Sequence, residues 1–165
     1  MLSRLQEQIA EMRRLSALPD TQLFATCDVS QWSPCEHVDH SVKVMSSIVG
    51  RLLDLNAERG RPFSFIGRLI LLFGWIPRGR GKSPKRLVGA RRTREELSAA
   101  LDALASQLAQ LDTAHLAPAR GPIVPHPLFG SLTPPQAVRF AAIHTKHHLK
   151  IVADLLRRGA AAARA

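Results

Sequence analysis

The stretch Trp32-Ser33-Pro34-Cys35-Glu36-His37-Val38-Asp39-His40 opens a long helix and decides the fold. Ser33 is a favoured N-cap residue, and Pro34 suits the first helical position, where its missing N–H would have no partner anyway. The helix is predicted to continue to about residue 58. It carries two apolar stripes, so it is expected to pack against neighbours on both sides. The main stripe contains Val38, Val42, Met45, Val49 and Leu52, and the weaker one Val44, Ile48 and Leu55.

Outward from this helix, the rest of the chain also predicts helices and no strand run. Apolar residues at helical spacing indicate helices over 2–17 and 63–76. Capping residues start two more helices, one from Thr93 along a leucine stripe to residue 111 and one from Thr133 to residue 158. Four long helices with short extra ones are typical of an all-α four-helix bundle. We expect a single domain over 1–159 and a disordered, alanine-rich tail over 160–165.

The composition agrees with a helical core in a cytoplasmic protein. The 165 residues contain no tyrosine and few aromatic residues, so Leu, Ala, Val and Ile must fill most of the interior. Cys27 and Cys35 are too few for a disulfide framework and are expected to be reduced thiols. The first 18 residues lack an apolar core of signal-peptide length. The apolar stretch 63–76 is too short to cross a bilayer, which favours a buried helix over one at a membrane surface and predicts no membrane partner.

The net charge of +10 comes mainly from one segment. Residues 78–94 contain eight basic residues and no acid, namely Arg78, Arg80, Lys82, Lys85, Arg86, Arg91, Arg92 and Arg94. This basic loop is interpreted either as a solvated loop or as a site for an anion or a phosphate-bearing ligand, with nucleic acid the least favoured partner because no aromatic residue is interleaved. The chain has no complete phosphate-binding loop and no GxSxG nucleophile elbow.

Seven histidines occur, and three of them lie in His144-Thr-Lys-His147-His148. His144 and His148 fall in the middle of the core-facing stripe of the last helix, one turn apart, where both imidazoles can reach one metal ion. The helix that starts at Pro34 could supply a third ligand, either His37 or His40, and a helical wheel slightly favours His37. The competing interpretation is that these are buried histidines bonded to neighbouring side chains or water.

Two segments about a hundred residues apart resemble the DinB-like family of helical-bundle metalloproteins. Residues 32–40 are similar to that family's Trp-Ser-x-x-Glu-x-x-x-His motif, and HPLFGSLTPPQ (126–136) followed by HTKHHLKIV (144–152) is similar to its second motif. The resemblance implies an up-down-down-up bundle, a metal bound by His40, His144 and His148, and frequent homodimers. It also implies activities that include low-molecular-weight thiol S-transfer and thiol-dependent isomerisation. The basic loop is longer and more charged than the family pattern.

Three imidazoles would leave an open position on a divalent ion, which suits Zn and also Ni or Fe. Together with the activities that the resemblance implies, this predicts a divalent-metal-binding protein that acts as a metal-dependent thiol S-transferase or hydrolase on a small molecule, with a low-molecular-weight thiol among the expected substrates. The alternative is a non-catalytic metal-binding bundle whose basic loop 78–94 binds a polyanion or nucleic acid. A fourth ligand from His37 or His147 would instead close the site and favour a structural ion.

Four further residues near these histidines have two interpretations each. Glu36 and Asp39 are favoured as first-turn acids that complement the helix dipole, over partners of an imidazole or a general base. His126 either approaches the site or shapes a turn. Trp32 is favoured as a core anchor over a contact with ligand.

Overall fold

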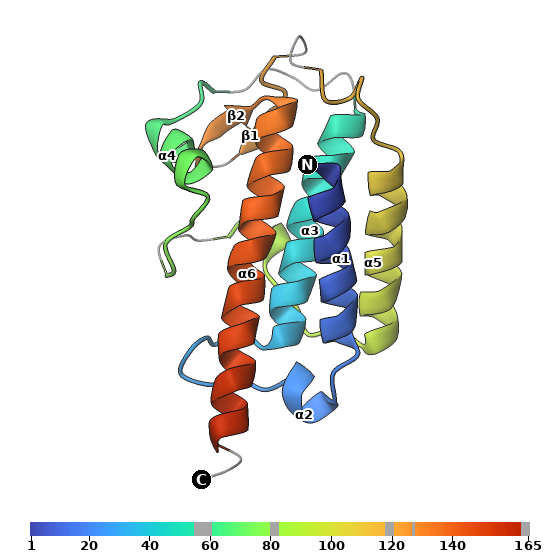
Figure 1. Cartoon of the computed structure of the whole chain (residues 1–165), viewed down its shortest axis with the longest axis vertical. Coiled ribbons are helices and arrows are strands. Elements are labelled where there is room, and N and C mark those ends of the chain that lie inside the picture. The colour runs from blue at the N-terminus through green and yellow to red at the C-terminus, as the bar shows by residue number, and fades with distance from the viewer. Residues whose placement is uncertain (55–60, 80–82, 118–120, 127, 163–165) are drawn as a thin grey trace.

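A computed structural model describes residues 1–54, 61–79, 83–117, 121–126 and 128–162. Four long helices run side by side: α1 (Leu2–Ser16), α3 (Pro34–Leu53), α5 (Arg94–Ala109) and α6 (Pro134–Ala162). Figure 1 shows α3 and α5 running in one direction and α1 and α6 in the other. This confirms the predicted all-α four-helix bundle with up-down-down-up order.

Helices α3 and α5 begin at the predicted N-cap residues Ser33 and Thr93. The Ser33 hydroxyl accepts a hydrogen bond from the Glu36 N–H, and the Glu36 carboxylate accepts one from the Ser33 N–H. Thr93 and Glu96 form the same reciprocal pair at the start of α5. Each pair satisfies two backbone donors that would otherwise have no partner, which fixes where the helix starts.

Short elements fill the connections, and their positions were not predicted. Helix α2 (Asp20–Leu23) follows α1, and the 3-10 helix η1 (Lys85–Leu87) lies within the basic loop. Strands β1 (Val124–His126) and β2 (Gly130–Leu132) pair antiparallel, with Val124 opposite Leu132. The prediction of no strands is therefore wrong. Each strand has only three residues, and β1 has a proline at its centre, so the sequence shows no alternation with a period of two.

Helices α3 and α6 end at other residues than predicted. Helix α3 ends at Leu53 and not near residue 58, and residues 55–58 lie outside the described part of the chain. Helix α6 continues through Gly159 to Ala162, into the alanine-rich tail, because alanine has the highest helix propensity. Residues 163–165 lie outside the described residues, so the end of the tail stays a prediction.

Helix α4 (Phe65–Phe73) lies outside the four-helix core, beside the hairpin and α6 (Figure 1). Gly67, Ile70 and Leu71 are buried, whereas Phe65 and Phe73 are exposed. The interpretation of 63–76 as a buried helix is therefore wrong for one of its faces. The helix is apolar on nearly all sides, so its sequence could not show which side finds a partner. No helix among the described residues is long and apolar enough to span a membrane.

Part of the basic loop packs tightly on α3. In residues 87–92, which we call the strap, the Ala90 N–H donates to the Asp39 carboxylate at 2.8 Å, and Arg92 forms an ion pair with the same carboxylate at 2.6 Å. Cys35 lies under Arg92 as a buried free thiol. A Cβ built on Gly89 would lie 2.2 Å from the Glu36 carbonyl oxygen, so only glycine fits there. The solvated-loop interpretation is therefore wrong for the strap.

Candidate metal centre

Three histidines from two helices meet inside the bundle. His40 of α3 and His144 and His148 of α6 each offer one ring nitrogen, and these nitrogens lie within 4.8 Å of one another. Nε2 of His40 is 3.2 Å from Nε2 of His144. Two nitrogens bound to one zinc ion at about 2.05 Å in tetrahedral geometry would be about 3.3 Å apart. The spacing of this pair therefore already matches a shared ion.

The strap sets the tautomer of His40. Nδ1 of His40 lies 2.5 Å from the carbonyl oxygen of Leu87, which can only accept a hydrogen bond. The Nδ1 of His40 must therefore carry the proton, and in the neutral ring Nε2 then holds a lone pair. That lone pair is the one that faces His144, as a metal ligand requires.

His37 supports His148 from behind. The two Nδ1 atoms are 2.9 Å apart, and Nε2 of His37 is 3.0 Å from the Ser30 hydroxyl. When Nδ1 of His148 donates, Nδ1 of His37 accepts, so the proton of the neutral His37 ring is on Nε2, which donates to Ser30. Nε2 of His148 then keeps a free lone pair. Carbonyl and imidazole partners of this kind orient metal-binding histidines in proteins.

The protonation state of the three rings also fits a metal. Nδ1 of His144 is buried and has no hydrogen-bond partner among the described residues. Burial lowers the pKa of His40, His144 and His148 below the usual 6.5, which keeps the rings neutral at pH 7. Neutral imidazole is the form that binds a metal. His144 and His148 are only half-buried, which leaves the cluster reachable from solvent.

Trp32 covers one side of the cluster. Its ring centroid lies 5.1 Å from that of His40 and 5.5 Å from that of His37, both edge to face, and 6.3 Å from that of His148 in a stacked arrangement. The indole thus packs against three of the rings while remaining partly exposed. It acts as an apolar wall that limits ring rotation and restricts water on that side.

The remaining candidates take other positions. Glu36 is occupied by the capping of α3, and Asp39 by the strap, so neither contacts a ring of the cluster through a described hydrogen bond. Nδ1 of His126 accepts hydrogen bonds from the N–H groups of Leu128 and Phe129, which shows that this residue shapes the hairpin turn. His147 lies beside His148, with the rings 5.1 Å apart and nearly perpendicular.

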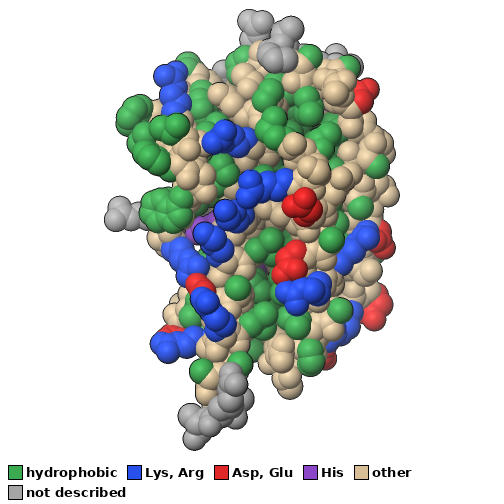
Figure 2. Space-filling view, viewed as in Figure 1, with side chains coloured by type: hydrophobic (Ala, Val, Ile, Leu, Met, Phe, Trp, Pro, Cys, Tyr) green, Lys and Arg blue, Asp and Glu red, His purple; other side chains and the backbone are tan. Residues whose placement is uncertain are grey.

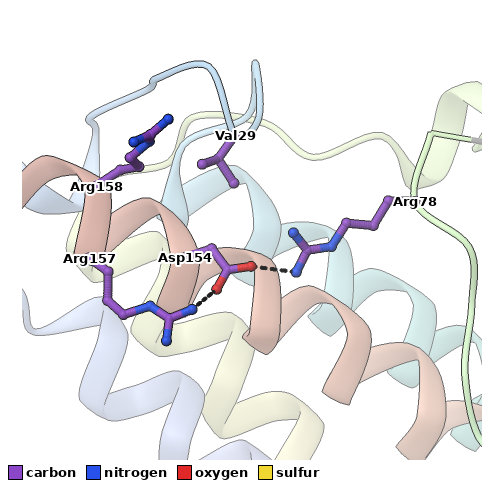
Figure 3. Close-up of a pocket in the computed structure, with 5 residues that line it drawn as sticks. All are labelled: Val29, Arg78, Asp154, Arg157 and Arg158. Carbon is purple, nitrogen blue, oxygen red and sulfur yellow. Dashed lines mark hydrogen bonds and ion pairs between the residues drawn. The ribbon is translucent and has the colours of Figure 1, made fainter.

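Two grooves share Arg78, and one of them reaches His147 beside the cluster. One has a volume of about 390 Å³ and is lined by His147, Trp75, Arg78, Lys146 and Lys150 among others. The other has a volume of about 450 Å³ and is lined by Val29, Arg78, Asp154, Arg157 and Arg158. Figure 3 shows Arg78 and Arg157 reaching the Asp154 carboxylate from opposite sides. Each groove therefore carries more cations than acids.

Sequence reasoning could not find the parts of the site that act through the backbone. The Leu87 carbonyl that orients His40 belongs to no motif, because any residue carries that group. Ser30 gave no signal either, since its role depends on where the irregular segment before α3 folds back. His37 was found as a candidate ligand, and it lies in the cluster as a hydrogen-bond partner of His148.

Comparison with known proteins agrees with the motifs and the fold. Searches among curated proteins and among solved structures give no match to this chain. Residues 4–152 match the DinB superfamily, a range that reaches from α1 into α6 and includes the whole histidine cluster. The chain belongs to the DinB superfamily.

Proposed function

We propose that this protein binds one divalent ion of Zn, Ni or Fe through His40, His144 and His148 and catalyses S-transfer with a low-molecular-weight thiol. The observation that carries the proposal is the convergence of three neutral imidazoles from α3 and α6 on one point. Imidazole ligands suit these three metals, and three protein ligands leave a position for substrate. An ion at this point would lower the pKa of a coordinated thiol or water and so supply a nucleophile at neutral pH.

Thiol chemistry fits the surroundings better than hydrolysis. Hydrolysis benefits from a general base that takes a proton from water, and carboxylates often have this role. The two acids nearest to His40 on α3 are otherwise engaged, Glu36 with the helix cap and Asp39 with Arg92 and Lys43. A thiol has a much lower intrinsic pKa than water, so it needs less help to lose its proton.

The cationic grooves suit a thiol that carries carboxylate groups. Lys146 and Lys150 line the groove beside His147 and are exposed. Arg78 lies in the same groove and is balanced by Asp154 at 2.7 Å. A small anionic thiol could place a carboxylate near the lysines while its sulfur reaches the histidine cluster.

The polyanion alternative receives less support. Of the eight basic residues in the basic loop, Arg78, Arg92 and Arg94 form ion pairs with Asp154, Asp39 and Asp20, and Arg91 lies over the ring of Phe24. Arg80 and Lys82 lie outside the described residues. The cations that the structure describes in this loop therefore serve mostly to attach it to the bundle.

Metal content by elemental mass spectrometry tests the proposal directly. The wild type should retain about one equivalent of metal, and the variant His144→Ala/His148→Ala should lose it. His115→Ala is the matched control, because His115 bonds Asp112 away from the cluster. The metal-loaded wild type is then assayed for transfer of small thiols to electrophilic substrates. No metal in the wild type after incubation with Zn²⁺, Ni²⁺ or Fe²⁺ would contradict metal binding, and full loading without thiol consumption would contradict transfer.

A further inference from the structure

Helix α4 presents an apolar face to solvent. Phe65 and Phe73 are each 72% exposed, Leu72 is 69% exposed, and Ile66 and Leu69 complete the face. These positions follow the i, i+1, i+4, i+7, i+8 spacing of one side of a helix, opposite the buried Gly67, Ile70 and Leu71. Trp75 continues the face just beyond the helix and is 61% exposed. Six large apolar side chains that lie together on a surface indicate a binding site.

A row of cations lies beside this apolar face. Arg139, Lys146, Lys150 and Arg157 are exposed along α6 and recur every four or seven residues, so they share one side of the helix. We call these four residues the basic row. Figure 2 shows Lys and Arg side chains following α6, next to the apolar cluster over α4. Helices α4 and α6 are in contact, so the two surfaces adjoin.

Most of the basic row is free to bind an external anion. Within the described residues, Arg139, Lys146 and Lys150 take part in no ion pair, whereas Arg157 pairs with Asp154. Arg68 of α4 adds another exposed cation between the phenylalanines. The face thus combines bulky apolar side chains and unpaired positive charge, which is the composition of helices that lie in a membrane interface.

We propose that the protein docks on an anionic lipid bilayer through the apolar face of α4 and the basic row of α6. Phe65, Leu72, Phe73 and Trp75 would enter the headgroup–acyl boundary, while Lys146 and Lys150 contact lipid phosphates. A second copy of this chain fits the face less well. Two such faces brought together would set cations against cations, in a protein whose net charge is already +10.

This inference is independent of metal binding, because it uses none of the three clustered histidines, but it shares Lys146, Lys150 and Trp75 with the groove beside His147. It differs from the sequence-based expectation of no membrane partner, which depended on burying both faces of residues 63–76. The exposed side chains of α4 remove that reason.

Vesicle flotation of the full chain tests the proposal. We expect binding to vesicles of phosphatidylcholine and phosphatidylglycerol in equal parts, weaker binding as salt rises, and little binding to phosphatidylcholine alone. The emission of Trp75 should shift to shorter wavelength with anionic vesicles, and Trp75→Phe should abolish that shift. Trp32 stays packed against the histidines and serves as the internal reference.

Two paired variants separate the contributions of charge and apolar area. Lys146→Gln/Lys150→Gln should weaken vesicle binding roughly 30-fold, because each cation near the membrane surface contributes about fivefold. The control Lys85→Gln/Arg86→Gln on η1 should bind vesicles as the wild type does. Leu72→Ser/Phe73→Ser should weaken binding by at least about tenfold. Its control, Val88→Ser, removes an exposed apolar side chain from the strap. All four variants change exposed side chains, and unchanged melting temperatures verify their folding.

Three results would overturn the proposal. The first is absence of binding to anionic vesicles at low salt, and the second is binding that Lys146→Gln/Lys150→Gln leaves intact. The third is a wild-type dimer in light scattering that Leu72→Ser/Phe73→Ser converts to a monomer without any vesicle binding. That third result would assign the α4 face to a second copy of the chain.

Discussion

The carbonyl oxygen of Leu87 lies 2.5 Å from Nδ1 of His40, although 47 residues separate them in the chain. This contact joins the strap to the histidine cluster. The strap is held on α3 by Asp39, which is almost completely buried and contacts both Arg92 and the Ala90 N–H. The orientation of His40 therefore depends on residues that never approach the metal position themselves.

Gly89→Ala should weaken metal binding through this strap. The added Cβ would lie 2.2 Å from the Glu36 carbonyl, so the strap must move off α3 and withdraw Leu87 from His40. We expect a loss of about 1–3 kcal/mol in the free energy of unfolding and a clearly weaker metal affinity, by calorimetry. Gly50→Ala is the control, because its Cβ meets nothing within 4 Å and a helical alanine should stabilise by about 0.5–1 kcal/mol. Equal metal affinities in the two variants would contradict the role of the strap.

Asp39→Ala should destabilise the fold and the site together. Its carboxylate forms ion pairs with Arg92 and Lys43, both at 2.6 Å, and accepts the Ala90 N–H. Losing these charged hydrogen bonds should cost about 2–3 kcal/mol in chemical denaturation, because Arg92 and Ala90 lose a buried partner. Asp102→Ala removes a surface ion pair with Arg13 and should cost under about 1 kcal/mol.

His37→Phe should reduce metal affinity while leaving the three proposed ligands His40, His144 and His148 in place. The ring keeps its packing against Trp32 but no longer accepts from Nδ1 of His148, 2.9 Å away. Loss of such a supporting partner typically lowers metal affinity 10- to 100-fold. Competition with a fluorescent zinc chelator would measure this. Complete loss of metal, as in His144→Ala/His148→Ala, would show instead that His37 is itself a ligand.

His126 should make the protein sensitive to mild acid. Burial lowers the pKa of His126 from 6.5 to about 4, so the unfolded chain binds a proton between these values that the folded chain does not. Stability from this residue is complete above about pH 6.5 and is lost as pH falls toward 4. Protonation at Nδ1 also removes the acceptor for the Leu128 and Phe129 N–H groups. His126→Asn keeps a hydrogen-bond acceptor but does not titrate. Its unfolding midpoint should therefore fall less than that of the wild type between pH 7 and pH 4.5. Identical pH profiles of the two proteins would contradict this account.

Sequence reasoning predicted what local chemistry decides. The caps Ser33 and Thr93 predicted where two helices start, and the structure adds the reciprocal bonds of Glu36 and Glu96, which act over three residues. The spacing of His144 and His148 placed them together because four residues make about one helical turn. These features need no knowledge of the rest of the fold.

Features that depend on distant partners could not be predicted. The helical wheel gives only the angle of a side chain, so it could not show that His40 faces His144 while His37 faces His148. The charge of the basic loop suggested a free segment, but its acidic partners Asp39 and Asp154 lie on α3 and α6. Which face of α4 is covered likewise depends on where that helix rests.

The histidine cluster joins positions 104 residues apart, His40 on α3 and His144 on α6. An ion shared between them can bind with all its ligands only after both helices have formed and docked, late in folding. Interactions absent from the folding transition state slow unfolding and leave the folding rate almost unchanged. Metal loading should therefore lengthen the lifetime of the folded bundle without accelerating refolding. Stopped-flow unfolding with and without a chelator would measure this kinetic stability, and equal unfolding rates would show that the ion does not connect the two helices.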